Sequence, residues 1–176
     1  MTRYSSTVCT TDAEQSAFVR FILNNWTEVR QGVELAYAFF CIFTVFRYGQ
    51  AILYRNDEGD IIAGVGFIKG TPLSFGADDG LCYIEMVYIK DGYRYTLLFK
   101  HMLIDLRNFI INTIPNIAEI RFLCHSEDLK LNRLAGKMAS QIGESTQFRP
   151  ASRYSLKWDN ANHFIHHLNR GAHSSP

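Results

Sequence analysis

The chain has 176 residues, with 18 basic and 17 acidic side chains, so its formal net charge at pH 7 is +1. This balance offers no electrostatic attraction to nucleic acid or to an anionic membrane, and we expect neither as a partner. Hydrophobic residues make up 47% and charged residues 20%, which excludes a disordered chain and is typical of a globular protein. The length predicts one domain over residues 1–158, followed by an extension at 159–176 that holds a short helix and a polar tail.

The four cysteines, Cys9, Cys41, Cys82 and Cys124, are far apart, and each lies in an apolar context. This arrangement predicts four buried free thiols in a reducing compartment. The polar N-terminus shows no signal-peptide pattern. We therefore expect a cytoplasmic protein.

The first elements are a strand within residues 3–10 and a helix that begins after Thr11 and Asp12. Thr11 and Asp12 can cap that helix, and Glu14 favours its positive end. The most apolar stretch follows, between Gly32 and Gly49. Its uninterrupted apolar part covers about 12 residues, fewer than the roughly 20 that span a bilayer.

Two interpretations of this apolar stretch stay open. It can be a core helix that turns into a strand. It can also be an aromatic surface for a partner protein, because so many neighbouring aromatic residues cannot all face one core. The sequence does not decide whether residues 33–48 form a helix or a strand.

A β-hairpin is predicted over residues 50–70, with strong turn residues between Asn56 and Asp60. Gly64 and Gly66 in its second strand indicate either a bulge or a close approach of a ligand to the backbone.

The remaining pattern is strand, helix, strand, helix, strand. A β-branched and aromatic run predicts a strand over residues 81–89, and apolar residues four apart predict a helix from Tyr93 to about Asn112. A strand is expected over 117–124, then a helix that Ser126 caps and Gly143 ends, and a closing strand over 152–158.

This order of elements resembles the GNAT superfamily, which transfers acetyl groups from acetyl-CoA to amines. Two segments show the resemblance. Val87 to Leu103 corresponds to the family's strand, arginine-bearing turn and helix, and Asn132 to Glu144 corresponds to its second motif. The resemblance implies an α+β fold, with a mixed, mostly antiparallel central sheet flanked by helices.

The same resemblance implies an acetyl-CoA site and an amine acceptor. Glu85 stands where the family often carries its general base. The backbone of Val87 and Ile89 would contact the cofactor, the amides around Arg94, Tyr95 and Thr96 would hold its diphosphate, and Asn132 would contact the pantetheine arm.

Departures from the family pattern support an alternative. The family's loop glycines correspond to Tyr95, Leu97 and Phe99, and the tyrosine that often serves as general acid corresponds to Ala139. Three bulky residues in a loop that normally admits phosphate indicate lost cofactor binding. The alternative is an inactive GNAT-like binding or structural module with a protein partner, for example a phage particle or host-interaction protein in the cytoplasm of a host cell.

Histidines do not indicate a metal site. His163 and His167 are four apart and can share a helical face, but Asp159 is the nearest further ligand, so we expect no bound metal. His125 follows a predicted strand where the family's cofactor channel opens, and it is a further candidate for a functional role.

Overall fold

The computed structural model describes residues 4–29, 34–72, 74, 77–94, 96–146 and 150–170, with side chains to residue 165. Its strands form one seven-stranded sheet in the order β1-β2-β3-β4-β5-β7-β6. The strands are β1 (Ser5–Val8), β2 (Gly49–Arg55), β3 (Ile61–Lys69), β4 (Leu81–Ile89), β5 (Glu119–His125), β6 (Ser140–Ser145) and β7 (Ala151–Lys157). Among the strands that the structure describes, only β4 and β5 pair in parallel, so the predicted mixed, mostly antiparallel α+β fold is confirmed.

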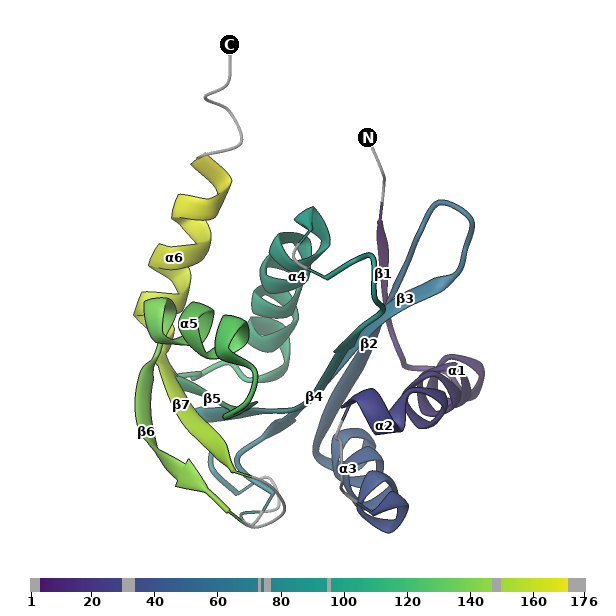
Figure 1. The fold of residues 1–176 in the computed structure, drawn as a ribbon, viewed down its shortest axis with the longest axis horizontal. Helices are drawn as coiled ribbons and strands as arrows, with labels where there is room; N and C mark the ends of the chain where they lie inside the picture. The colour runs from purple at the N-terminus through teal and green to yellow at the C-terminus, as the bar shows by residue number, and fades with distance from the viewer. Residues whose placement is uncertain are drawn as a thin grey trace.

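In the part of the chain that the structure describes, six helices cover the two faces of this sheet (Figure 1). One group is α1 (Asp12–Asn24), α2 (Trp26–Val29) and α3 (Leu35–Tyr48), and the other is α4 (Leu97–Thr113), α5 (Leu129–Met138) and α6 (Trp158–Arg170). Each group encloses its own apolar core against the sheet, because successive side chains of a strand point to opposite faces. Ile52 packs on the α4 side, and its neighbour Leu53 packs on the α1 and α3 side.

The N-terminal half follows its sequence pattern closely. Thr11 accepts a hydrogen bond from the backbone N–H of Glu14, and the Glu14 carboxylate accepts one from the N–H of Thr11, so the predicted cap is a complete capping box. The undecided stretch forms a helix, α3, from Leu35 to Tyr48, and Glu34 is its N-cap residue. The hairpin β2–β3 turns between Asn56 and Asp60 as predicted.

Gly64 and Gly66 also have a packing role that the sequence did not predict. A Cβ added to Gly64 would lie 3.3 Å from both Phe18 and Phe21, and one added to Gly66 would lie 2.8 Å from Val45. The two glycines therefore let α1 and α3 pack closely on β3. A bulge does lie beside Gly66, where the register with β4 shifts before Phe67.

The helix predicted within residues 126–143 is present, but its predicted cap and its predicted end were wrong. The helix begins at Leu129, capped by Asp128, and ends at Met138, because Ala139 has extended backbone. Gly143 lies in β6, an edge strand that pairs with β7. The helix was predicted to be too long because Leu134, Met138 and Ile142 happen to be four residues apart. Ile142 belongs to the edge strand β6, so its place in that spacing does not reflect a helix.

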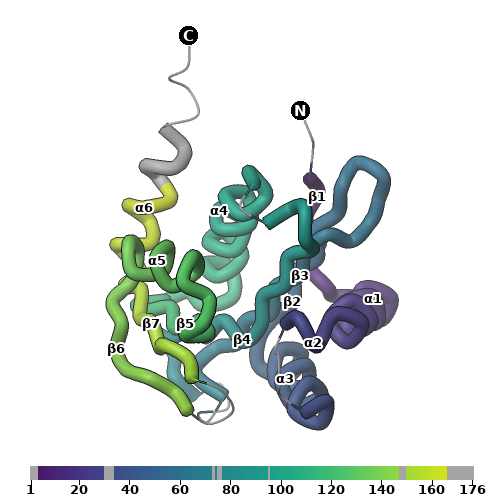
Figure 2. The backbone as a smooth tube through the Cα atoms, viewed as in Figure 1, coloured from purple at the N-terminus to yellow at the C-terminus, as the bar shows by residue number. Residues whose placement is uncertain are grey.

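The boundary at residue 158 falls inside packed structure. Trp158 is the first residue of α6, and Ala161 and Ile165 are buried. Arg107 of α4 donates a 2.6 Å hydrogen bond to the side chain of Asn162. The first part of α6 therefore shares the core of the domain, and Figure 2 shows this helix alongside α5 and α4.

Candidate functional site

The site is a gap between the second halves of β4 and β5. The two strands pair only at their beginnings, where Leu81–Tyr83 lies beside Glu119–Arg121. Beyond that point β4 continues along β3 to Ile89, and β5 continues along β7 to His125, so the parallel strands diverge (Figure 1). Within the described residues, one edge of β4 therefore has no neighbouring strand over its second half.

A β-bulge in β4 marks the start of the gap. Met86 pairs with Gly66 and Ile84 pairs with Phe67, so Glu85 is the extra residue that opposes no residue of β3. Bulges redirect a side chain and increase the local twist of a strand. The bulge therefore accompanies the divergence of the strands, and Glu85, only 2% exposed, is at this point.

The alternating hydrogen-bond pattern of β4 indicates that the backbone N–H groups of two predicted site residues face the gap. The N–H of Lys90 donates to the carbonyl of Ile62 on β3, with an N–O distance of 2.9 Å. Because alternate residues of an antiparallel strand bond to the same neighbour, Tyr88 also faces β3, and Val87 and Ile89 face away from it. The N–H groups of Val87 and Ile89 are then on the open edge, and the side chain of Val87 is 42% exposed.

Helix α4 begins at the open end of β4. Thr96 caps it: its hydroxyl accepts a hydrogen bond from the N–H of Leu98 at 3.2 Å and donates one to the carbonyl of Tyr93 at 2.7 Å. With this cap the helix begins at Leu97. The apolar spacing had predicted that it begins at Tyr93, so the predicted start was wrong. The first turn contains Lys100 and no acidic residue.

Two of the three bulky loop residues are described. Leu97 is 60% exposed, Phe99 is half-buried, and Tyr95 lies outside the described residues. The side chain of Leu97 is therefore directed to solvent and not into the core.

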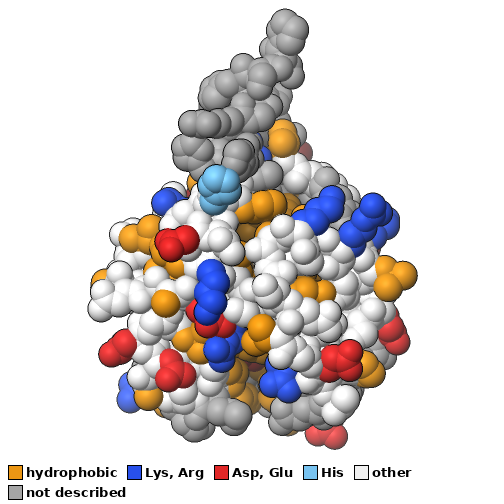
Figure 3. Space-filling model, turned by 90° about the vertical axis from the view of Figure 1, so that its left-hand side faces the viewer, with side chains coloured by type: hydrophobic (Ala, Val, Ile, Leu, Met, Phe, Trp, Pro, Cys, Tyr) orange, Lys and Arg blue, Asp and Glu red, His pale blue; other side chains and the backbone are white. Residues whose placement is uncertain are grey.

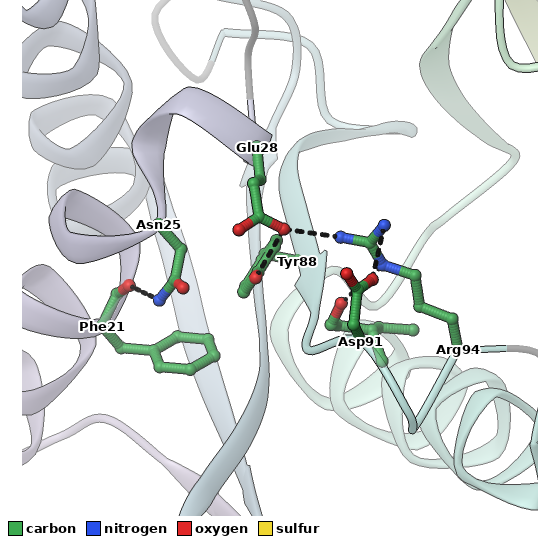
Figure 4. Close-up of polar contacts among 7 residues, drawn as sticks. Phe21, Asn25, Glu28, Tyr88, Asp91 and Arg94 are labelled. Carbon is green, nitrogen blue, oxygen red and sulfur yellow. Dashed lines mark hydrogen bonds and ion pairs between the residues drawn. The ribbon is translucent and has the colours of Figure 1, made fainter.

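Arg94 is held by a cluster that the sequence did not predict (Figure 4). Its guanidinium donates to the carbonyl of Ile89 at 2.8 Å and forms ion pairs with Glu28 at 3.1 Å and Asp91 at 2.9 Å. The same Glu28 oxygen accepts a 2.9 Å hydrogen bond from the hydroxyl of Tyr88, and Arg94 lies 5.6 Å above the Tyr88 ring. Burial, together with that carboxylate, raises the pKa of Tyr88.

The cluster joins α2 to the loop between β4 and α4. Glu28 is separated from Arg94 by 66 positions in the chain, and no spacing or composition signal connects them. The cluster contains two carboxylates, those of Glu28 and Asp91, and one guanidinium, so its formal charge is −1.

Asn132, on the other flank of the gap, supports the turn that leads out of β5. Its side-chain amide donates to the carbonyls of His125 at 2.6 Å and Asp128 at 2.8 Å. Its oxygen accepts a 3.1 Å hydrogen bond from the hydroxyl of Tyr154. The side chain of Asn132 is thus committed to the β5–α5 turn, and His125 contributes its carbonyl to the same turn.

A hollow lies at the closed end of the β4–β5 pair. It is a groove of about 590 Å³ lined by β5, β7, the end of α5 and β6. Glu119 in its lining accepts hydrogen bonds from Arg121 at 2.7 Å, Ser155 at 2.6 Å and Lys157 at 3.3 Å. These donors, Arg121 first, lower the pKa of Glu119 to about 2. Figure 3 faces this side of the molecule and shows acidic and basic side chains next to one another.

The four cysteines are buried and unbonded to one another, as predicted. Burial raises the pKa of Cys124 to about 12, so its thiol stays protonated at neutral pH. Within the described residues, no three His, Cys, Asp or Glu side chains are grouped as metal ligands would be. In that same part of the chain, the helices are too short or too polar to cross a bilayer.

The structure thus brings Glu85, Val87, Ile89, Arg94 and Thr96 to the open half of β4 and the loop that follows it. Solved acetyltransferases share this architecture. An acetyltransferase from Streptococcus agalactiae 2603 is 12% identical, with a TM-score of 0.67 over 88% of this chain and 98% of that one. An acetyltransferase of the GNAT family from Staphylococcus aureus MU50 is 13% identical, with a TM-score of 0.63 over 88% and 99%.

A spermidine/spermine N-acetyltransferase from Vibrio cholerae is 10% identical, with a TM-score of 0.61 over 96% of each chain. No family model matches the sequence, and no curated protein matches it. The similarity is therefore one of three-dimensional structure. The chain has the GNAT acetyltransferase fold.

Proposed function

We propose that the protein is an acyltransferase that moves an acetyl group from acetyl-CoA to an amine. The observation that carries this proposal is the divergence of β4 from β5 beyond Tyr83, with Glu85 in a bulge at its start. A strand edge with unused N–H groups can bind an amide-containing arm as a further strand would. The pantetheine arm of acetyl-CoA contains two amides, so its chemistry fits this edge.

The residues of the gap would divide the work of binding. The N–H groups of Val87 and Ile89 would donate to the pantetheine arm. The amides around Arg94 and Thr96 and the positive end of α4 would hold the diphosphate, and Lys100 in the first turn of α4 adds a positive charge there. Asn132 would act from the other flank, by keeping the β5–α5 turn in place.

Glu85 is the proposed general base. Acetyl-CoA, when bound, supplies the acetyl group as a thioester. An amine attacks only when it is neutral, and the Glu85 carboxylate would accept its proton directly or through one water molecule. A backbone N–H at the open edge of β4 would donate to the carbonyl oxygen of the thioester as negative charge develops on it. The new N–C bond would form as the C–S bond breaks, and CoA would leave as its thiol with the proton that Glu85 accepted from the amine or with one from solvent.

Calorimetric titration with acetyl-CoA, followed by an assay for free CoA with a panel of primary amines, tests the proposal. We expect saturable binding and release of CoA with at least one amine. Absence of both heat and thermal stabilisation at millimolar acetyl-CoA would contradict it. The acceptor can be a small molecule, a peptide N-terminus or a lysine, and the amine panel should contain all three classes.

A second candidate function is that of a binding module that has lost the cofactor. The exposed Leu97 favours it, because this side chain stands at the helix end where relatives of the family carry glycine. The double variant Leu97→Gly with Phe99→Ala separates the two candidates. If only the variant binds acetyl-CoA, side chains block the wild-type loop, and the module interpretation holds. Equal binding by both proteins would exclude it.

A further inference from the structure

Helix α3 has two apolar faces, and only one of them contacts the core. Ala38, Cys41, Ile42 and Val45 are buried against the sheet. The outward face carries Phe39, Phe40 and Phe43, which are 54%, 38% and 59% exposed. A helix that is apolar all round is normally covered on all sides, so the outward face is a surplus that the fold does not explain.

The outward residues form one continuous strip. Ala36, Phe39, Phe40, Phe43 and Arg47 follow the spacing of a single helical face, and we call them the α3 strip. Leu35, at its margin, is 53% exposed, and Tyr37 stacks on Phe40 with ring centroids 5.8 Å apart. No charged residue occurs between Glu34 and Arg47.

The exposed area is that of an interaction surface. A phenylalanine side chain has about 150–250 Å² to bury, so the three exposed fractions together leave about 300 Å² of apolar surface. A patch of about 300–600 Å² on a monomer is often functional. Two such faces, with Leu35 and the flanking side chains, approach the roughly 1,000 Å² that a specific interface needs.

We infer that the α3 strip binds the α3 strip of a second copy of this chain, with the two helices antiparallel about a two-fold axis. If the two-fold axis passes midway between Phe40 and Phe43, Phe40 of each copy lies against Phe43 of the other. It also brings the small Ala36 opposite the long Arg47. Glu34 and Arg47, the charged residues at the two ends, are both exposed and opposite in sign, so this orientation is electrostatically complementary.

Other occupants fit the α3 strip less well. A basic or acidic peptide would find no charge in the middle of the strip to recognise. An anionic membrane attracts helices with several basic residues on their polar face, whereas α3 has only Arg47. The net charge of +1 leaves two copies without mutual repulsion.

Sedimentation velocity of the full chain over a wide concentration range tests the inference. We expect a monomer–dimer equilibrium in wild type and at least a tenfold higher dissociation constant in the double variant Phe39→Ser with Phe43→Ser. The matched control is Leu129→Ser with Ile142→Ser, which replaces two apolar residues that are 76% and 52% exposed on other elements. The control should associate like wild type.

A covalent test fixes the orientation. The single variants Ala36→Cys and Arg47→Cys are oxidised mildly, each alone and as a mixture. Antiparallel helices place position 36 of one copy opposite position 47 of the other, so the mixture should give a disulfide-linked dimer and neither variant alone should do so, whereas linkage within each single variant would indicate parallel helices. A wild-type monomer at every concentration overturns the inference, as does an equal loss of association in the control. Binding of a monomer to neutral lipid vesicles, abolished in the Phe39 and Phe43 variant, would also overturn it, in favour of a lipid surface.

Discussion

The two halves of β4 have similar side chains but different neighbours. The first half, Leu81–Tyr83, pairs with a strand on each side, and its end of the sheet is fastened by the donors around Glu119. The second half, beyond the bulge at Glu85, keeps β3 on one side and has an open edge on the other. The comparison teaches that one strand serves both as core and as candidate site, because pairing stops part of the way along it.

The largest expected effect is on the chemistry of the open half. Glu85→Gln keeps the size of the side chain but removes the proton acceptor, so we expect a loss of turnover of about 10²–10⁴-fold. Binding of acetyl-CoA should stay within a few fold of wild type. Steady-state kinetics and calorimetry measure the two effects separately. An active Glu85→Gln variant would remove Glu85 from the proposed mechanism.

Proline substitutions separate the two edges of β4. Lys90→Pro removes the N–H that donates to Ile62, and we expect it to reduce the free energy of unfolding by about 1–3 kcal/mol. Val87→Pro removes an N–H that faces the gap, so it should destabilise the fold less and weaken acetyl-CoA binding more. Denaturant unfolding and calorimetry of both variants test this. Equal destabilisation by the two prolines would show that the N–H of Val87 is also used within the sheet.

The closed half should be sensitive to acid. The pKa of Glu119 in the folded protein is about 2, below its ordinary value of 4.5. Its carboxylate therefore stabilises the fold fully above about pH 4.5, and this contribution is lost as the pH falls towards 2. At neutral pH we expect Glu119→Gln to lower the free energy of unfolding by about 1–2 kcal/mol, allowing for partial solvent screening.

The measurement is the denaturant midpoint of wild type and Glu119→Gln between neutral pH and pH 3. The difference between the two proteins should shrink with decreasing pH. Transfer activity should be unchanged, because Glu119 is at the end of the sheet away from the gap. A pH-independent difference would mean that the carboxylate charge is not the cause.

The smallest effect is expected at the cluster around Arg94. Glu28 is about half-exposed, and exposed ion pairs contribute only about 0.2–1 kcal/mol, so Glu28→Gln should change the thermal midpoint little. It also removes a negative charge near the proposed diphosphate site, and acetyl-CoA should bind slightly more tightly, most clearly at low salt. Glu34→Gln is a matched control on another exposed position. An identical change in affinity in both variants would indicate a general charge effect.

Local sequence signals predicted a large part of the fold. The capping box at Thr11, the turn between Asn56 and Asp60 and the run over residues 81–89 each depend on neighbours in the chain, and each was confirmed. The edge strand β6 was missed because its partner β7 supplies the hydrogen bonds that make it a strand. Residues of an edge strand carry little pattern of their own.

For the candidate site, the sequence by itself determined which residues lie along β4 and that Arg94 and Thr96 follow in the next loop. The tertiary structure alone decided that β5 leaves β4 after Tyr83, that Glu85 is the bulged residue, and that Glu28 reaches Arg94 across 66 positions. It also decided that Phe39 and Phe43 face outwards, although α3 is apolar on both sides. The physical reason is that strand pairing and helix packing are contacts between distant segments, and local patterns fix a segment's shape but not its neighbours.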